Sequence, residues 1–87
     1  MARVSGQQDM DGSLKRLGDA VRAARKSRGM SQEALADAAG IDRSHMGKIE
    51  RGERNVTLLN VTRIAKAIGC KASDLLASAD LTFCESI

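Results

Sequence analysis

The chain has 87 residues and a mass of 9.3 kDa, which is enough for one small domain and leaves no room for a second hydrophobic core. It contains one Phe and no Trp, Tyr or Pro, whereas an all-β sandwich needs aromatic strands and frequent turn residues. Ala, Leu, Arg, Lys and Glu are plentiful instead, and these residues favour helices. The composition therefore predicts a small and mostly helical domain.

Several classes of function are excluded by the residues that are missing. The single histidine, His45, and the two cysteines, Cys70 and Cys84, do not have the spacing of a zinc site. No glycine-rich phosphate loop and no carboxylate–histidine–nucleophile arrangement can be found. We therefore expect no metal, no cofactor and no enzymatic activity. No apolar run approaches the ~18 residues that cross a bilayer, and the first residues do not resemble a signal peptide, so the sequence predicts a cytoplasmic protein.

The positive charge is concentrated in the middle of the chain. The formal net charge is +3, but residues 12–77 hold 13 basic and 7 acidic residues, a net charge of +6. Basic residues form one group at Arg22, Arg25, Lys26 and Arg28, and a second at Arg43, Lys48, Arg51, Arg54, Arg63, Lys66 and Lys71. This excess favours an anionic partner, although an ordinary solvated surface has a similar composition.

Cap residues and apolar periodicity predict three helices in the first part of the chain. Residues 1–12 are polar and without periodicity, which predicts a flexible arm. Ser13, Ser31 and Asp42 are suitable N-caps, and Gly29, Gly40 and Gly52 follow the ends of the corresponding helices. The inward positions of these three helices are predicted to be Leu14, Leu17, Val21, Ala24, Leu35, Ala36, Ala39, Met46 and Ile49.

Two more helices are predicted beyond a polar loop. Thr57 is the expected N-cap of a fourth helix that ends at Gly69, and a fifth helix is expected to begin around residues 71–73 and to bury Leu75 and Leu76. The expected inward stripe of the fourth helix is Leu58, Val61, Ile64, Ala65 and Ile68. Residues 78–87 form a tail that fits either a strand or an extension. The sequence thus predicts an all-α fold of five helices.

Residues 31–52 carry the pattern with the clearest functional meaning. Two short predicted helices are joined by a turn in which Gly40 can adopt a positive φ. The small Ala36 allows the helices to approach closely, and Ile41, Met46 and Ile49 anchor the second helix on the core. Arg43, Ser44, Gly47 and Lys48 are then expected to point outward, which is the geometry that lays a helix in a DNA major groove.

In these residues the chain resembles the Cro/cI-type (Xre-like) helix-turn-helix domain. The resemblance covers residues 13–77, with the motif at 32–51, and implies a five-helix lambda-repressor-like fold. It is carried by Ser31, Gln32, Glu33, Leu35, Ala36, Gly40 and the run Ile49, Glu50, Arg51, Gly52. The length and the stretch from Ile41 to Gly52 are most similar to controller proteins of restriction–modification systems.

The resemblance implies a role for individual residues. The expected base-reading residues are Arg43, Ser44, His45 and Lys48, and the expected phosphate contacts are Gln32, Arg51, Arg54 and Asn55. Arg25 and Glu50 match an ion pair that ties the first helix to the end of the recognition helix. The apolar residues that the core leaves over are the candidate dimer surface: Leu76, Leu81, Phe83 and Ile87.

These observations lead to one main hypothesis and two alternatives. The main hypothesis is a homodimeric, sequence-specific transcriptional regulator that binds a palindromic operator in double-stranded DNA through residues 42–51. The first alternative is an antitoxin, which also binds DNA but mainly neutralises a toxin protein. The second is a protein–protein interaction module that keeps the fold without binding DNA.

Overall fold

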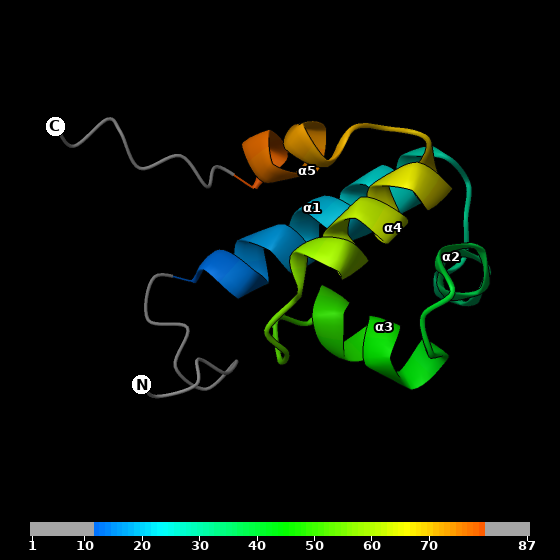
Figure 1. Ribbon diagram of the computed structural model, residues 1–87, viewed down its shortest axis with the longest axis horizontal. Helices are drawn as coiled ribbons and strands as arrows, with labels where there is room; N and C mark the ends of the chain where they lie inside the picture. The colour runs from blue at the N-terminus through cyan, green and yellow to red at the C-terminus, as the bar shows by residue number, and fades with distance from the viewer. Residues whose placement is uncertain (1–11, 80–87) are drawn as a thin grey trace, which may run out of the picture.

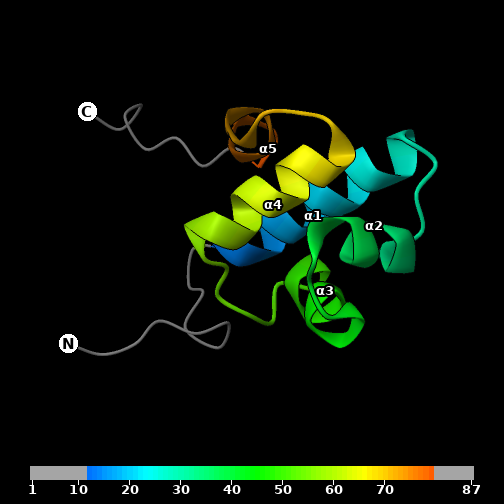
Figure 2. The same ribbon diagram turned by 45° about the vertical axis from the view of Figure 1, so that its right-hand side comes forward.

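The computed structural model describes residues 12–79, which form five helices and no strand (Figure 1). The helices are α1 (Ser13–Ser27), α2 (Gln32–Ala39), α3 (Arg43–Glu50), α4 (Leu58–Ile68) and α5 (Ala72–Ser78). In Figures 1 and 2, α1 and α4 lie at the centre, with α5 on one side of them and α2 and α3 on the other. The predicted all-α fold of five helices is confirmed.

Three of the predicted N-caps form as expected. The side-chain oxygens of Ser31 and Thr57 accept hydrogen bonds from backbone N–H groups three residues later, at 3.0 and 3.1 Å. The Asp42 carboxylate accepts from the backbone N–H groups of Ser44 and His45, at 3.0 and 3.3 Å. Each bond satisfies a donor that the first turn of a helix leaves without an intrahelical partner.

The start of α1 differs from the prediction. Ser13 is the first helical residue and not the N-cap, which is Gly12. Gly12 has a φ of 72°, a conformation that glycine adopts without steric cost, and its carbonyl accepts the first helical bond from Arg16 N at 2.9 Å. At the other end of the described chain, α5 continues to Ser78, one residue beyond the expected boundary, and the following Ala79 is buried.

The hydrophobic core receives one face from every helix. Its largest fully buried side chains are Val21, Leu35, Met46, Ile49, Ile64 and Leu75. Leu14 and Leu76, which were expected inside, are only half-buried. The prediction for Leu58 is wrong, because this side chain is 72% exposed and its neighbour Leu59 is 59% exposed. Val56, just before the helix, packs against the core instead, so the first turn of α4 lies at the edge of the protein.

A close crossing of α1 and α3 fixes the position of α3. A Cβ atom on Gly18 would lie 2.5 Å from the carbonyl oxygen of Glu50 and 2.6 Å from that of Ile49, so only glycine fits there. A Cβ atom on Gly52 would lie 2.7 Å from the Cα of Lys15. The backbone of α1 therefore holds the C-terminal end of α3 at two points.

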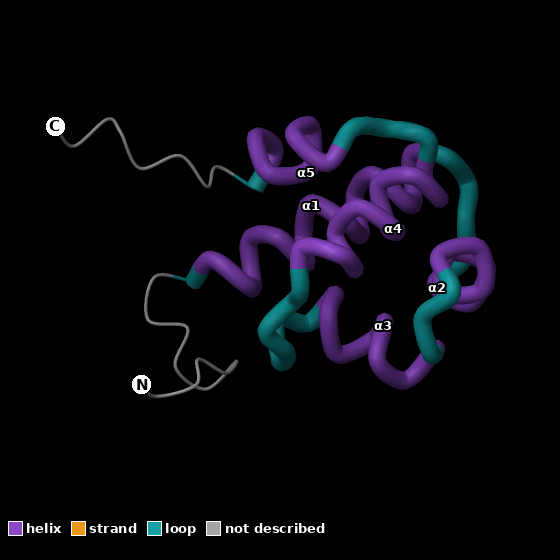
Figure 3. Tube along the Cα trace, in the orientation of Figure 1, coloured by secondary structure: helices purple, strands orange, loops and turns teal. Residues whose placement is uncertain are grey.

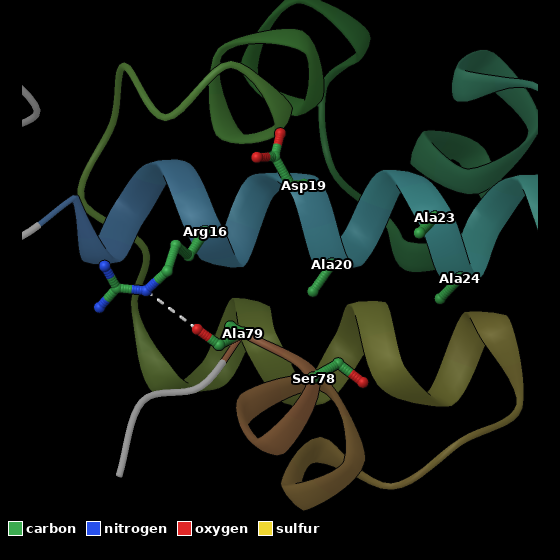
Figure 4. Close-up of a pocket in the computed structure, with 7 residues that line it drawn as sticks. All are labelled: Arg16, Asp19, Ala20, Ala23, Ala24, Ser78 and Ala79. Atoms are coloured by element: carbon green, nitrogen blue, oxygen red, sulfur yellow. Dashed lines mark hydrogen bonds between the residues drawn. The ribbon is translucent and has the colours of Figure 1, made fainter. Parts of the chain in front are cut away.

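A groove of about 530 Å³ lies between α1 and α5. Figure 4 shows its seven lining residues, which are Arg16, Asp19, Ala20, Ala23, Ala24, Ser78 and Ala79. At one end of the groove, Arg16 Nε donates a hydrogen bond to the Ala79 carbonyl oxygen at 3.1 Å. None of the lining residues belongs to α2 or α3. In the described part of the chain, none of the helices has the length and apolarity needed to span a membrane.

Candidate nucleic-acid interface

Helices α2 and α3 form a compact pair joined by a short turn, whereas a longer loop leads from α3 to α4 (Figure 3). Gly40 ends α2 with a φ of 69°, and Ile41 N–H donates to the Ala36 carbonyl oxygen at 2.9 Å. Ala36 and Ile49 are each 1% exposed, so the inner faces of the two helices belong to the core. The outer face of α3 is left open to a partner.

Arg43, Ser44 and Lys48 are the candidate base-reading residues that reach this outer face. Arg43 and Ser44 are exposed and Lys48 is half-buried. Arg43 Nη1 lies 3.1 Å from Glu33 Oε1, at the start of α2. Both side chains of this pair are more than 60% exposed, and exposed ion pairs are held by no more than about 1 kcal/mol. A base edge can therefore compete with Glu33 for Arg43.

Gly47, which was expected to point outward from α3, is buried. A Cβ atom there would lie 3.1 Å from Arg51 Nη1 and 3.4 Å from Gln32 Oε1. The side chains of Gln32 and Arg51 thus lie over this glycine and cover it. Periodicity identified the correct side of α3 but could not show that side chains from both sides of the helix pair converge there.

His45 is placed differently from the other three candidate base-reading residues. Its side chain is half-buried, and its Nε2 atom is shielded from solvent without a hydrogen-bond partner among the described residues. A buried nitrogen must change its position before it can contact a base. The base-reading role of His45 therefore stays a prediction.

A buried network ties α3 to α1 and α2. Arg25 donates from Nε and Nη2 to the two carboxylate oxygens of Glu50, at 2.9 and 3.1 Å, and from Nη1 to the Met30 carbonyl oxygen at 2.9 Å. Gln32 Nε2 donates to Glu50 Oε1 at 3.1 Å. The Arg25 and Glu50 side chains are only 10% and 3% exposed. Glu50 therefore holds the end of α3 against α1 and orients Gln32 at the start of α2.

The loop after α3 presents the remaining candidate phosphate contacts. Arg51, Arg54 and Asn55 are all exposed. Arg51 forms a two-pronged ion pair with Glu53, from Nε to Oε2 at 2.9 Å and from Nη2 to Oε1 at 3.3 Å. These hydrogen bonds raise the pKa of the Arg51 guanidinium and hold the pKa of the Glu53 carboxyl below its ordinary value.

The acidic partners of the candidate contacts were not predicted from the sequence. Glu33 pairs with Arg43 and Glu53 pairs with Arg51. The only available signal was proximity in the sequence, because Glu53 follows Arg51 by two residues in a loop. The partnership of Glu33 with Arg43 joins two helices and has no local signature.

Most of the candidate dimer surface lies outside the described residues. Leu76 is half-buried and packs against the core, while Leu81, Phe83 and Ile87 fall in residues 80–87, outside the described range. Cys70 is half-buried and also packs against the core. Cys84 and the expected arm at residues 1–11 are outside the described range as well.

Comparison with known proteins identifies the family. A family model described as "Helix-turn-helix" matches residues 21–75, which is more than half of the chain. The chain therefore belongs to the helix-turn-helix family of transcriptional regulators.

Individual similar proteins indicate a narrower class within this family. The control protein C.BamHI of Bacillus amyloliquefaciens is 44% identical over 70 residues, which cover 79% of this chain and 86% of that protein. The control protein C.SmaI of Serratia marcescens is 42% identical over 60 residues, covering 69% and 71%. The crystal structure of the restriction–modification controller protein C.AhdI from Aeromonas hydrophila is 42% identical, with a TM-score of 0.70, and the match covers 71% of this chain and 94% of that one. The resemblance to restriction–modification controllers is thus confirmed.

Proposed function

We propose that this chain is a sequence-specific DNA-binding regulator that acts in the cytoplasm as a homodimer on a palindromic operator. The observation that carries the proposal is the two-sidedness of α3. Met46 and Ile49 are buried in the core, while Arg43 and Ser44 are exposed on the opposite side. An anchored helix with a polar and basic outer face fits the major groove.

The candidate contacts divide into base-reading and positioning groups. Arg43 is suited to two hydrogen bonds with guanine O6 and N7, and Ser44, His45 and Lys48 extend the base-reading set along α3. Gln32 is positioned at the N-terminus of α2, where backbone N–H groups favour a phosphate. One amide N–H of Gln32 bonds Glu50, and the other can donate to the DNA backbone. Arg51, Arg54 and Asn55 continue the phosphate contacts beyond α3.

Dimerisation follows from the small size of one recognition unit. A single helix-turn-helix reads few bases, and specific affinity usually needs two half-sites about 34 Å apart. We assign the dimer surface to Leu76 together with Leu81, Phe83 and Ile87, because a domain of this size has little core left to bury these apolar residues. The operator should therefore be palindromic.

Selection of binding sites from randomised duplex DNA at two salt concentrations tests this proposal. We expect a palindromic motif with half-sites about 10 base pairs apart. Weak, salt-sensitive binding without any motif would reduce the interaction to non-specific phosphate contact. That outcome would favour a protein-binding role on the same fold, either as an antitoxin or as an interaction module.

Substitutions at Arg43 and Gln32 should affect DNA binding in two distinct ways. We expect Arg43→Ala to lose about 1–3 kcal/mol of discrimination at a single base position. Gln32→Ala should instead weaken binding to all sequences by a similar factor, because a phosphate contact carries no sequence information. The measurement is affinity for the selected operator and for each of its single-base variants. The control is Arg22→Ala, which removes an exposed arginine of α1.

An Arg43→Ala variant with unchanged affinity and unchanged preference would contradict the assignment of α3 as the recognition helix. A Gln32→Ala variant that changes preference at one base would contradict the positioning role of Gln32.

A further inference from the structure

Glu53 lies in the loop that follows the proposed recognition helix α3 and contacts both the last turn of that helix and Arg51. Its backbone N–H donates to the Lys48 carbonyl oxygen at 2.9 Å, which fixes the residue against the last turn of α3. Its carboxylate receives two hydrogen bonds from Arg51. An acidic side chain therefore lies among the basic residues that are the candidate phosphate contacts.

The charge of Glu53 is maintained at neutral pH. Hydrogen bonds from Arg51 lower the pKa of the carboxyl, burial opposes this shift, and the positive charges of Arg51 and Lys48 add to it. The Glu53 carboxylate is thus ionised whenever the protein meets DNA near neutral pH. It presents to Arg51 the same kind of oxygen pair that a phosphate group would present.

We propose that Glu53 is a positioning residue that weakens the phosphate contact of Arg51 by competing for its guanidinium, and so limits the affinity of the chain for any duplex. This inference deepens the proposed function and depends on it. A phosphate must displace the carboxylate before it can bind the Arg51 guanidinium, and the Glu53 charge repels that phosphate. Since phosphate contacts are independent of sequence, Glu53 sets how tightly DNA is bound without changing which sequence is preferred.

The exposure of the pair allows the competition to be measured. The Arg51 and Glu53 side chains are 57% and 53% exposed, so a phosphate can reach either of them. An exposed ion pair contributes roughly 0.2–1 kcal/mol, which corresponds to about a 1.5- to 5-fold change in affinity. Salt dependence supplies an independent readout, because each additional phosphate contact steepens the plot of log affinity against log salt by about 0.9.

The test compares Glu53→Gln with Asp19→Asn in the full chain. Both variants remove one negative charge from an exposed ion pair, since Asp19 binds Lys15 at 2.7 Å with side-chain exposures of 57% and 61%. We expect Glu53→Gln to bind the selected operator and a random duplex about 1.5- to 5-fold more tightly, with a salt slope steeper by up to about 0.9. Asp19→Asn should change the salt slope little, and neither variant should alter the selected motif.

A double-mutant cycle shows whether Glu53 acts through Arg51. In the wild-type background Arg51→Ala should cost less affinity than in the Glu53→Gln background, because Glu53 competes with phosphate for the guanidinium. In the Glu53→Gln background the same substitution should remove the gained affinity and the additional salt slope. A structural role of Glu53 would not produce this dependence of the salt slope on Arg51.

Three results would overturn the inference: a Glu53→Gln variant that binds no more tightly than Asp19→Asn, a gain that persists in the absence of Arg51, or a changed motif. The proposed function fails separately, when the wild-type chain selects no motif at all. In that case the comparison of salt slopes on a random duplex still tests the competition between Glu53 and phosphate.

Discussion

The buried pair of Arg25 and Glu50 is the residue-scale feature on which the placement of α3 depends. It is far less exposed than the ion pairs of Arg43 and Arg51. Removing one member of a buried pair leaves the other charge without compensation and costs about 3–5 kcal/mol. We therefore expect Arg25→Met to lower the free energy of unfolding by about that amount, measured by urea denaturation.

Two companion variants make this measurement specific. Arg22→Met changes an exposed arginine on the same helix and should alter stability by no more than about 0.5 kcal/mol. Replacing both partners, as Arg25→Met with Glu50→Leu, should recover part of the loss, because no uncompensated charge remains. An Arg25→Met variant as stable as Arg22→Met would show that the pair does not hold α3 against α1.

At the scale of the elements, substituting alanine for either of two glycines within helices is expected to change stability in opposite directions. Gly18 faces backbone carbonyl oxygens that cannot move without separating α1 from α3. Gly47 faces the ends of the Arg51 and Gln32 side chains, which can yield by a few tenths of an ångström. We expect Gly18→Ala to cost about 3 kcal/mol in overpacking, which exceeds the gain of about 1 kcal/mol in helix propensity.

Gly47→Ala should be neutral or should stabilise the protein by up to about 1 kcal/mol, because it gains helix propensity and only displaces a flexible arginine. Thermal unfolding of both variants against the wild type measures the difference. Equal effects of the two substitutions would mean that the α1–α3 crossing is not as close as the Gly18 contacts indicate.

The helices could be predicted from the sequence because their signals are local. Ser31, Asp42 and Thr57 each cap the helix that begins at the next residue, by accepting a hydrogen bond from a backbone N–H group two or three residues later. Gly40 and Gly69 adopt the positive φ that ends a helix. The buried faces were less predictable. Leu58 satisfies the apolar period of α4 but lies in a first turn at the edge of the core, and periodicity carries no information about where the core ends.

The sequence predicted which residues belong to the candidate site and one of their interactions, the Arg25–Glu50 pair, but not the other contacts. The expected positions of Arg43 and Lys48 on α3 follow from the period of one helix. The contacts of Gln32 with Glu50 and of Glu33 with Arg43 join different helices, so they depend on how α2 and α3 pack. The burial of Gly47 could not be predicted from one helix either, because it depends on the side chains of Gln32 and Arg51, which meet over this glycine.

On the scale of the whole molecule, the proposed homodimer needs a surface that joins two copies. All of the buried hydrophobic residues found in residues 12–79 pack into one core cluster. The proposed dimer surface includes three apolar residues of that tail. A second apolar surface consists of Leu58 and Leu59, which are exposed on the first turn of α4.

Truncation after Ala79 separates folding from dimerisation. We expect the truncated chain to keep its helical content and cooperative unfolding, because the buried hydrophobic residues described in residues 12–79 already form one cluster, but to sediment as a monomer where the full chain is a dimer. Its operator binding should weaken and lose cooperativity between half-sites, since each recognition helix must then bind alone. The matched control is the full chain with Leu58→Ser and Leu59→Ser, which should remain dimeric. If the control becomes monomeric and the truncated chain stays dimeric, the dimer surface lies on α4 and the assignment to the tail is wrong.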